Sequence, residues 1–240
     1  MTENNKFFRP KKLSIEEIKS GCVYVYGKDS DEAQICLMNE EFRQGFDIVK
    51  KNKDGKKSVT FWGSARLPVD NEYYQKALRL SRRLASEADC MVVTGGGPGI
   101  MEAGNRGAYE EGKPSLGLTI NLPHEQNTNQ YVTEDIPFYF FFTRKTLMAY
   151  SAEAYLYFPG GFGTLDELFE ILTLVQTEKI SKLPIVLVGK KFWEPLDSFI
   201  RQALLAENQT ISEEDLKLYT ILDDEDEIVN IVKSAPMRND

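Results

Sequence analysis

The chain has 240 residues, 42% of them hydrophobic, which is enough for one globular domain with a sizeable core. Its net charge of −8 argues against a nucleic-acid-binding surface, which needs a basic face. The sequence contains no apolar run long enough to span a membrane and no signal-peptide core near its start, so we expect a cytoplasmic protein without a membrane partner.

The cysteines and the histidine limit the kinds of catalytic and metal site that the sequence can form. Cys22, Cys36 and Cys90 are odd in number and widely spaced, which fits buried thiols in a reducing compartment better than disulfides or a zinc site. His124 is the only histidine, so a histidine-based triad or a multi-histidine metal site is excluded. We expect a site without metal or other cofactor.

Residues 1–57 are predicted to form a partly helical N-terminal extension that packs on the core. Within it, residues 21–27 (GCVYVYG) have the composition of a strand, and residues 39–51 fit an amphipathic helix. The charged residues 51–58 then indicate a turn.

From residue 58 onward, apolar runs alternate with helical patterns. Strands are expected at 58–63, 90–94, 115–123, 138–142, 154–159, 183–189 and 216–222, and helices at 73–88, 99–112, 143–154, 163–179, 191–207 and 224–234. This alternation predicts an α/β fold for residues 58–240, a Rossmann-like, doubly wound parallel sheet with helices on both faces.

Three of these strands end in glycine, at Gly63, at Gly95-Gly96-Gly97 and at Gly160-Gly161. In open parallel sheets, ligands bind beyond the carboxyl ends of the strands. The glycines do not fit the dinucleotide fingerprint, because its third glycine position is not occupied and the next strand ends without an acidic residue. A P-loop string is also absent from the sequence.

Two of the glycine segments nevertheless suit an anion. Gly97-Pro98-Gly99 and residues 161–164 each precede or open a predicted helix, where backbone N–H groups and the helix dipole favour a phosphate. Arg144 and Lys145 follow an aromatic run and are candidate phosphate ligands. Both segments together predict a phosphorylated ligand.

Thr164 and Glu167 allow two interpretations. Their T-x-x-E spacing is that of a capping box, which explains both residues structurally. The same spacing also places a carboxylate one helical turn from a phosphate loop, where it can act in catalysis. The pattern alone leaves both interpretations open.

Several segments resemble one family in the same order. PGGFGTLDE (159–167), TGGGPGIMEAGNRGA (94–108) and FTRKTLM (142–148) are similar to the PGGxGTxxE, GGGxxGxM and RKxxM segments of the "Lonely Guy" (LOG) proteins. FWGSAR (61–66) and LPHEQNTNQY (122–131) resemble its longer bacterial branch. The resemblance covers roughly residues 40–235.

The resemblance implies a Rossmann-like fold and a homodimer. It leaves open whether dimers assemble into larger oligomers. It also implies a hydrolase that cleaves the N-glycosidic bond of nucleoside 5′-monophosphates, either AMP or cytokinin riboside monophosphates, to free base and ribose 5-phosphate. Such sequences have often been labelled lysine decarboxylases, but this sequence shows no context for a Schiff-base lysine.

Carried over by motif, the catalytic pair is Arg144 and Glu167. The substrate-binding residues implied by the resemblance are Gly97, Gly99, Met101, Glu125, Lys145, Met148, Gly161, Phe162, Gly163, Thr164, Leu165, Asp166 and Thr173. The Gly99–Glu102 stretch and the N-terminal extension depart from the short plant members. An alternative function is a non-enzymatic nucleotide or molybdenum-cofactor carrier, which would keep the glycine loops without needing the Arg144/Glu167 pair.

Overall fold

The computed structural model describes residues 14–27, 30–121 and 128–238. Seven strands in these ranges form one sheet, in which all neighbours are parallel and the order is β4-β3-β2-β1-β5-β6-β7. They are β1 (Ser58–Trp62), β2 (Met91–Thr94), β3 (Ser115–Ile120), β4 (Glu134–Phe138), β5 (Ala154–Tyr157), β6 (Ile185–Val188) and β7 (Thr220–Leu222). The predicted α/β fold with a parallel sheet is confirmed.

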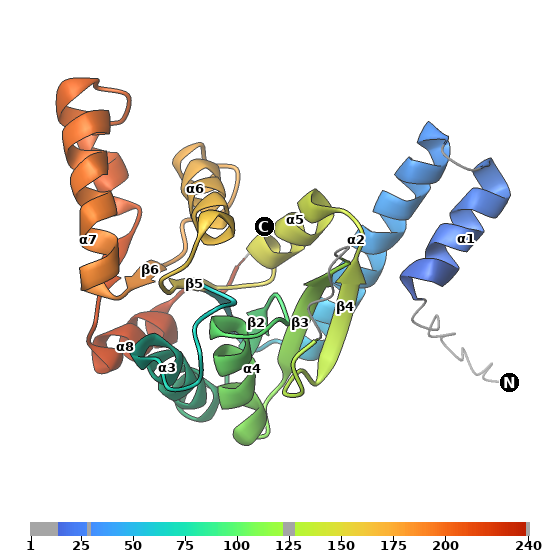
Figure 1. Ribbon diagram of the computed structural model, residues 1–240, viewed down its shortest axis with the longest axis horizontal. Coiled ribbons are helices and arrows are strands. Elements are labelled where there is room, and N and C mark those ends of the chain that lie inside the picture. Colours follow the sequence, from blue (N-terminus) through green and yellow to red (C-terminus); the bar gives the residue numbers. More distant parts are fainter. Residues whose placement is uncertain (1–13, 28–29, 122–127, 239–240) are drawn as a thin grey trace, which may run out of the picture.

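The helices cover both faces of this sheet (Figure 1). The α-helices are α1 (Ile15–Tyr26), α2 (Asp31–Lys53), α3 (Glu72–Ala88), α4 (Ile100–Glu110), α5 (Phe141–Tyr150), α6 (Phe162–Gln176), α7 (Lys190–Phe199) and α8 (Glu225–Ser234). A π-helical stretch, Ile200–Glu207, continues α7, and a 3-10 helix covers Glu213–Lys217.

The core has two halves because the strand side chains alternate between the faces. On one face, Phe61 and Leu156 pack with residues of α3, α4 and α8. On the other face, Trp62 and Tyr157 pack with residues of α2, α5, α6 and α7. Both faces are buried, which explains why the strands read as nearly continuous apolar runs.

The sheet reverses its strand order at β1. The chain first builds β1, β2, β3 and β4 outward, and then returns to place β5 on the other side of β1. Such a switch point opens a crevice at the carboxyl ends of the two central strands. The glycines that follow β1, β2 and β5 meet at this edge, as the sequence predicted.

Three expected elements differ in the structure. Residues 21–27, predicted as a strand, form the end of α1, which begins with a capping box between Ser14 and Glu17. The aromatic run 138–142 is split, because β4 ends at Phe138 and α5 begins at Phe141. The last strand covers only Thr220–Leu222, and the first two residues of its expected range, Leu216 and Lys217, belong to the 3-10 helix.

The expectation of free cysteines is wrong for two of them. Cys22 of α1 and Cys36 of α2 form a disulfide, whose Cα atoms are 5.8 Å apart. Helical pairing of α1 and α2 brings together residues that lie 14 positions apart in the sequence. Cys90 is a buried free thiol, and burial raises its pKa to about 11.

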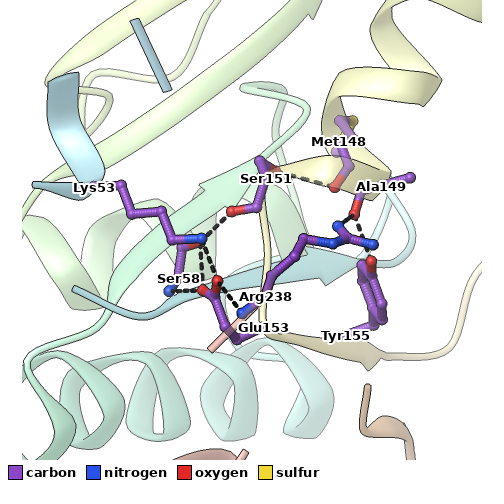
Figure 2. A network of polar contacts seen from close by, with 8 residues as sticks. All are labelled: Lys53, Ser58, Met148, Ala149, Ser151, Glu153, Tyr155 and Arg238. Atoms are coloured by element: carbon purple, nitrogen blue, oxygen red, sulfur yellow. Dashed lines mark hydrogen bonds and ion pairs between the residues drawn. The ribbon is translucent and has the colours of Figure 1, made fainter. Parts of the chain in front are cut away.

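The buried Glu153 carboxylate connects segments that are distant in the sequence, at the amino ends of the central strands (Figure 2). Glu153 accepts hydrogen bonds from the backbone N–H of Ser58, at 2.8 Å, and from the backbone N–H of Arg238 near the end of the chain, at 3.4 Å. It also pairs with Lys53, the last residue of α2. This network therefore joins α2 and the C-terminal tail to the sheet, at the end opposite the glycine loops.

The N-terminal helices lie beside the β4 edge of the sheet (Figure 1). α2 contacts β4 and α5, whereas α1 packs mainly on α2. None of the helices in the described ranges has the length and apolar character needed to cross a membrane. Treating residues 1–57 as a separate extension remains a prediction.

Candidate active site

The carboxyl ends of β1, β2 and β5 border an open cleft of about 740 Å³. It is lined by the loop after β1, by Gly95, by Met101 of α4, by Phe141 and Arg144 of α5, and by residues 161–167. Nine of the sequence-predicted site residues therefore meet here, namely Met101, Arg144, Gly161, Phe162, Gly163, Thr164, Leu165, Asp166 and Glu167.

The start of α6 forms one wall of this cleft. Its N-cap is Gly161, and the first helical bond joins the Leu165 N–H to the Gly161 carbonyl at 3.1 Å. The backbone amides of residues 162–164 precede that bond, so they have no acceptor within the helix and are available to an anion.

The capping-box interpretation of Thr164 and Glu167 is wrong. The helix begins two residues before Thr164, and its N-cap makes no side-chain hydrogen bond. Thr164 instead packs against Gly160, where an added Cβ would collide with the Thr164 hydroxyl. Glu167 therefore has no capping role, and the interpretation that it acts on a ligand remains.

Glu167 is a buried carboxyl group facing the cleft, with 7% of its surface exposed. Burial raises its pKa to about 7, although the charges of Lys145 and Arg144 act in the opposite direction. In the described part of the chain, no group donates a hydrogen bond to this carboxyl. Such a group exchanges protons near neutral pH, as expected of a general acid or base.

Arg144 lies across the cleft from the start of α6. Its Nε donates a hydrogen bond to the Leu118 carbonyl at 2.6 Å, which fixes the guanidinium at the end of β3. Burial lowers the pKa of Arg144, while Glu167 raises it. Arg144 and Glu167 therefore interact electrostatically inside a shielded site, where such interactions are stronger than in water.

Lys145 forms ion pairs with two acidic side chains and does not line the cleft. Its Nζ lies 2.7 Å from Asp166 and 2.7 Å from Glu170. Burial lowers the pKa of Lys145, but its hydrogen bonds to these two carboxylates outweigh that effect and raise it. The arrangement joins α5 to α6 and so connects the helices that contain Arg144 and Glu167.

The other predicted residues lie away from the cleft lining. Met148 is fully buried in the core, and the exposed Thr173 donates its hydroxyl hydrogen bond to the Phe169 carbonyl at 2.7 Å. Gly97 and Gly99 are buried behind the loop after β1. Glu125 lies outside the described residues.

Only one of the two predicted anion segments opens into the cleft. At the start of α4, the Ile100 N–H already donates to the Ser64 carbonyl at 3.0 Å. Gly99 has a φ of +68°, and a side chain there would collide with the same carbonyl. This glycine segment therefore packs against the loop after β1, and the start of α6 is the better anion site.

A network of polar side chains forms hydrogen bonds to the glycine loop after β2. Asn129 donates to the carbonyls of Gly96 and Gly97 and to the Asn105 side chain, at 2.9 to 3.0 Å. Thr94 donates to Asn105 at 2.6 Å and accepts from the Gly96 N–H. Gly95 is thereby fixed directly below Arg144.

Sequence reasoning missed some of the cleft lining. Ser64, Arg66 and Trp62 line the cleft, and the FWGSAR segment contains all three. Its position at the carboxyl end of the predicted strand was the signal that could have identified them. Within the described residues, no cluster of three or more histidine, cysteine or acidic side chains could hold a metal ion.

Comparisons with known proteins place the chain in a family. Residues 101–232, more than half of the chain, match the family model described as "Possible lysine decarboxylase". The chain is 31% identical over 134 residues to the cytokinin riboside 5′-monophosphate phosphoribohydrolase LOG of Oryza sativa subsp. japonica, covering 55% of each protein. This chain belongs to the LOG family.

Other LOG relatives are similarly distant. LOG2 of Arabidopsis thaliana is 29% identical, with 55% of this chain and 62% of that protein covered. A phosphoribohydrolase of Rhodococcoides fascians is 29% identical, with 61% and 75% covered. The chain thus spans between half and two thirds of the length of the first two relatives.

Solved structures with the same fold include molybdenum cofactor proteins. The molybdenum cofactor binding protein of Rippkaea orientalis has a TM-score of 0.57 at 18% identity, covering 75% of this chain and 96% of that chain. The molybdenum cofactor carrier protein of Chlamydomonas reinhardtii has a TM-score of 0.53 at 21% identity, covering 75% and 98%. At these identities the likeness concerns the fold alone.

Proposed function

We propose that this LOG-family protein hydrolyses the N-glycosidic bond of nucleoside 5′-monophosphates, such as AMP or cytokinin riboside monophosphates. The products are the free base and ribose 5-phosphate. The observation that supports this most is the buried Glu167 carboxyl, with a pKa of about 7, one helical turn from the open start of α6 and in electrostatic contact with Arg144.

The start of α6 suits the 5′-phosphate. Its free amides can donate to phosphate oxygens, and the positive end of the helix dipole stabilises a negative charge by roughly 0.3 to 2 kcal/mol. Gly161 and Gly163 leave this approach open, since a Cβ added at either position would meet no atom within 4 Å. The cleft volume of about 740 Å³ lies in the range typical of small-molecule sites.

Glu167 is the residue we assign to the bond-breaking step. Cleavage develops positive charge on the ribose as the bond from C1′ to the base nitrogen breaks. A carboxylate near C1′ stabilises that charge and takes a proton from the attacking water, whose oxygen bonds to C1′. The departing base takes up a proton, so the reaction consumes one water and needs no further reactant.

Arg144 has a positioning and electrostatic role in this scheme. A guanidinium stays protonated in proteins and therefore cannot act as a base. Its charge in the shielded cleft can hold the phosphate or ribose and stabilise negative charge on the departing base. The hydrogen bond to the Leu118 carbonyl keeps it in place before substrate binds.

The direct test is to incubate the protein with a panel of nucleoside monophosphates and to assay free base and ribose 5-phosphate. Release from at least one member of the panel supports the enzyme. Tight binding of a nucleotide or of the molybdenum cofactor, without release of base from any nucleotide, would instead favour the carrier alternative.

We also propose a cytoplasmic homodimer, as the LOG resemblance predicts. Phe162 at the cleft rim is 92% exposed, and Phe141 of α5 is 55% exposed, which supports a cover over this edge of the cleft. Light scattering coupled to gel filtration tests the assembly, since a mass near twice 27.4 kDa is expected.

A further inference from the structure

A buried carboxylate outside the cleft, Glu41, contacts the helix that contains Arg144. Glu41 lies on α2 with only 2% of its surface exposed. Its carboxylate accepts a hydrogen bond from the Tyr139 N–H at 2.5 Å and another from the Thr143 hydroxyl. Both donors belong to the first turn of α5 or to the residues just before it.

The start of α5 is not stabilised by a side chain at its own N-cap. The N-cap residue is Phe140, which has no side-chain acceptor for the first amides of the helix. The Glu41 carboxylate instead binds the Tyr139 N–H, just before the helix, and the Thr143 hydroxyl in its first turn. Its negative charge also matches the positive end of the helix dipole. Burial raises the pKa of Glu41, while the hydrogen bonds from Thr143, Tyr139 and Phe140 lower it.

α2 and α5 also approach closely at a second point. Gly45, one turn after Glu41, faces Leu147 of α5, and a Cβ added there would collide with the Leu147 side chain. The missing side chain lets the helices pack at short distance, which brings the Glu41 carboxylate to the start of α5. Two separate features of α2 thus set the position of α5.

Arg144 directly follows Thr143, so its backbone moves with this first turn. The Arg144 N–H bonds to the Phe140 carbonyl at 3.4 Å, and its Nε bonds to Leu118 at 2.6 Å. A shift at the start of α5 therefore changes how the guanidinium reaches the cleft. Misplacement of a reacting or binding group by about 1 Å can cost on the order of a hundredfold in rate.

We infer that Glu41 is a positioning residue for the proposed active site, which anchors the start of α5 to the neighbouring helix α2 through Tyr139 and Thr143 and so sets the place of Arg144. The inference rests on the proposed role of Arg144. It assigns α2 a part in activity beyond packing on the core.

The test is a double-mutant cycle on the full chain with AMP as the probe. Glu41→Gln keeps the shape of the side chain but removes the charge and replaces one acceptor oxygen with a donor. We expect kcat/KM for AMP to fall about tenfold. In an Arg144→Ala background, the same change should alter kcat/KM less than twofold, because the group that Glu41 positions is gone. An equal loss in both backgrounds would overturn the inference.

Glu40→Gln is the matched control. Glu40 is the neighbouring residue on the same helix and pairs with Arg43 at the surface, at 2.7 Å. It should leave kcat/KM unchanged. If Glu40→Gln lowers activity as much as Glu41→Gln, the effect belongs to the charge of α2 as a whole, and the positioning role is refuted.

Two further variants test the inference even if Glu41→Gln does not fold. Thr143→Val removes the hydroxyl donor while keeping the side-chain shape, and Gly45→Ala places a methyl group against the Leu147 side chain, so that the contact between α2 and α5 must shift. Each should lower kcat/KM for AMP several-fold in the Arg144 protein and less than twofold in the Arg144→Ala protein. Unchanged kcat/KM in both variants contradicts the inference.

Hydrogen exchange separates this inference from the proposed function. In the ligand-free protein, Glu41→Gln should speed exchange of amides in residues 139–146 at least fivefold, while Glu40→Gln should not. This result supports the anchoring of α5 by Glu41 even if the wild-type protein hydrolyses no nucleotide, in which case only the proposed function fails. Exchange unchanged from wild type refutes this anchoring.

Discussion

The guanidinium of Arg144 occupies the space that a side chain at Gly95 would need. A Cβ built on Gly95 collides with Nη2 of Arg144 and comes within 2.7 Å of the Met101 sulfur. Position 95, directly after β2, therefore has no room for a side chain, because the guanidinium of Arg144 packs against it. This relationship connects the GGG segment to the RK segment, which lies almost 50 residues later in the chain.

Gly95→Ala should thus displace Arg144 without changing any charged group. We expect kcat/KM for AMP to fall about 10- to 100-fold, since the arginine is held on its other side by Leu118 and cannot shift freely. Steady-state assays of base release measure this. Gly21→Ala is the control, because a Cβ there meets no atom within 4 Å, and equal activity of the two variants would argue against the packing constraint.

The raised pKa of Glu167 also predicts a pH-dependent cost in stability. A pKa of about 7 in the folded state, against 4.5 ordinarily, means that the folded protein binds this proton more tightly than the unfolded chain. The contribution of the protonated Glu167 carboxyl to the free energy of unfolding is therefore fully present below pH 4.5. It is lost as the pH rises through 7. The difference corresponds to about 3 kcal/mol at most.

Glu167→Gln, which is neutral at every pH, should escape this cost. The free energy of unfolding of the variant, relative to wild type, should increase between pH 5 and pH 8 by an amount approaching 3 kcal/mol. Urea denaturation at several pH values measures the difference. A constant difference across this range would show that the carboxyl is not desolvated in the folded protein.

Glu153 should matter for stability and not for activity. Replacing it by Gln removes the charge partner of the largely buried Lys53 and weakens the contact to the C-terminal tail, so we expect a loss of about 3 to 5 kcal/mol. Because the network lies at the strand ends opposite the cleft, kcat/KM of the folded fraction should stay near wild type. A large activity loss with unchanged unfolding energy would contradict this assignment.

The disulfide predicts a simple thiol count. Denatured without reductant, the chain should show one reactive thiol, from Cys90, and after reduction all three cysteines should react. In the folded protein Cys90 should react slowly, because it is buried and its pKa is raised to about 11. Three reactive thiols without reductant would mean that Cys22 and Cys36 are not bonded.

The sequence predicted the fold and most of the cleft because both depend on local patterns. Strands ending in glycine and followed by amphipathic helices indicate a parallel sheet, and such a sheet places Arg144 and Glu167 at one edge. The misread segment 21–27 shows the limit of composition. Its β-branched and aromatic residues suggest a strand, yet the Ser14-x-x-Glu17 capping box starts a helix at Ile15 that continues through Tyr26.

Long-range contacts could not be predicted in this way. Glu41 and Thr143 are 102 residues apart, and Glu41 occupies an unremarkable position in an amphipathic helix until α2 packs on α5. The T-x-x-E pattern of Thr164 and Glu167 was ambiguous because the same spacing fits a helix that begins two residues earlier. The position of the N-cap at Gly161 rules out the capping box, and the action of Glu167 on a ligand stays a prediction.

The central claim is that Glu167 acts on bound nucleotide, and one comparison tests it directly. Wild type and Glu167→Gln are saturated with the nucleoside monophosphate that the panel identifies, and base release and nucleotide affinity are measured on the same samples. We predict that the variant binds with an affinity within about threefold of wild type while kcat falls at least a hundredfold. A variant that releases base at nearly the wild-type rate would contradict the claim.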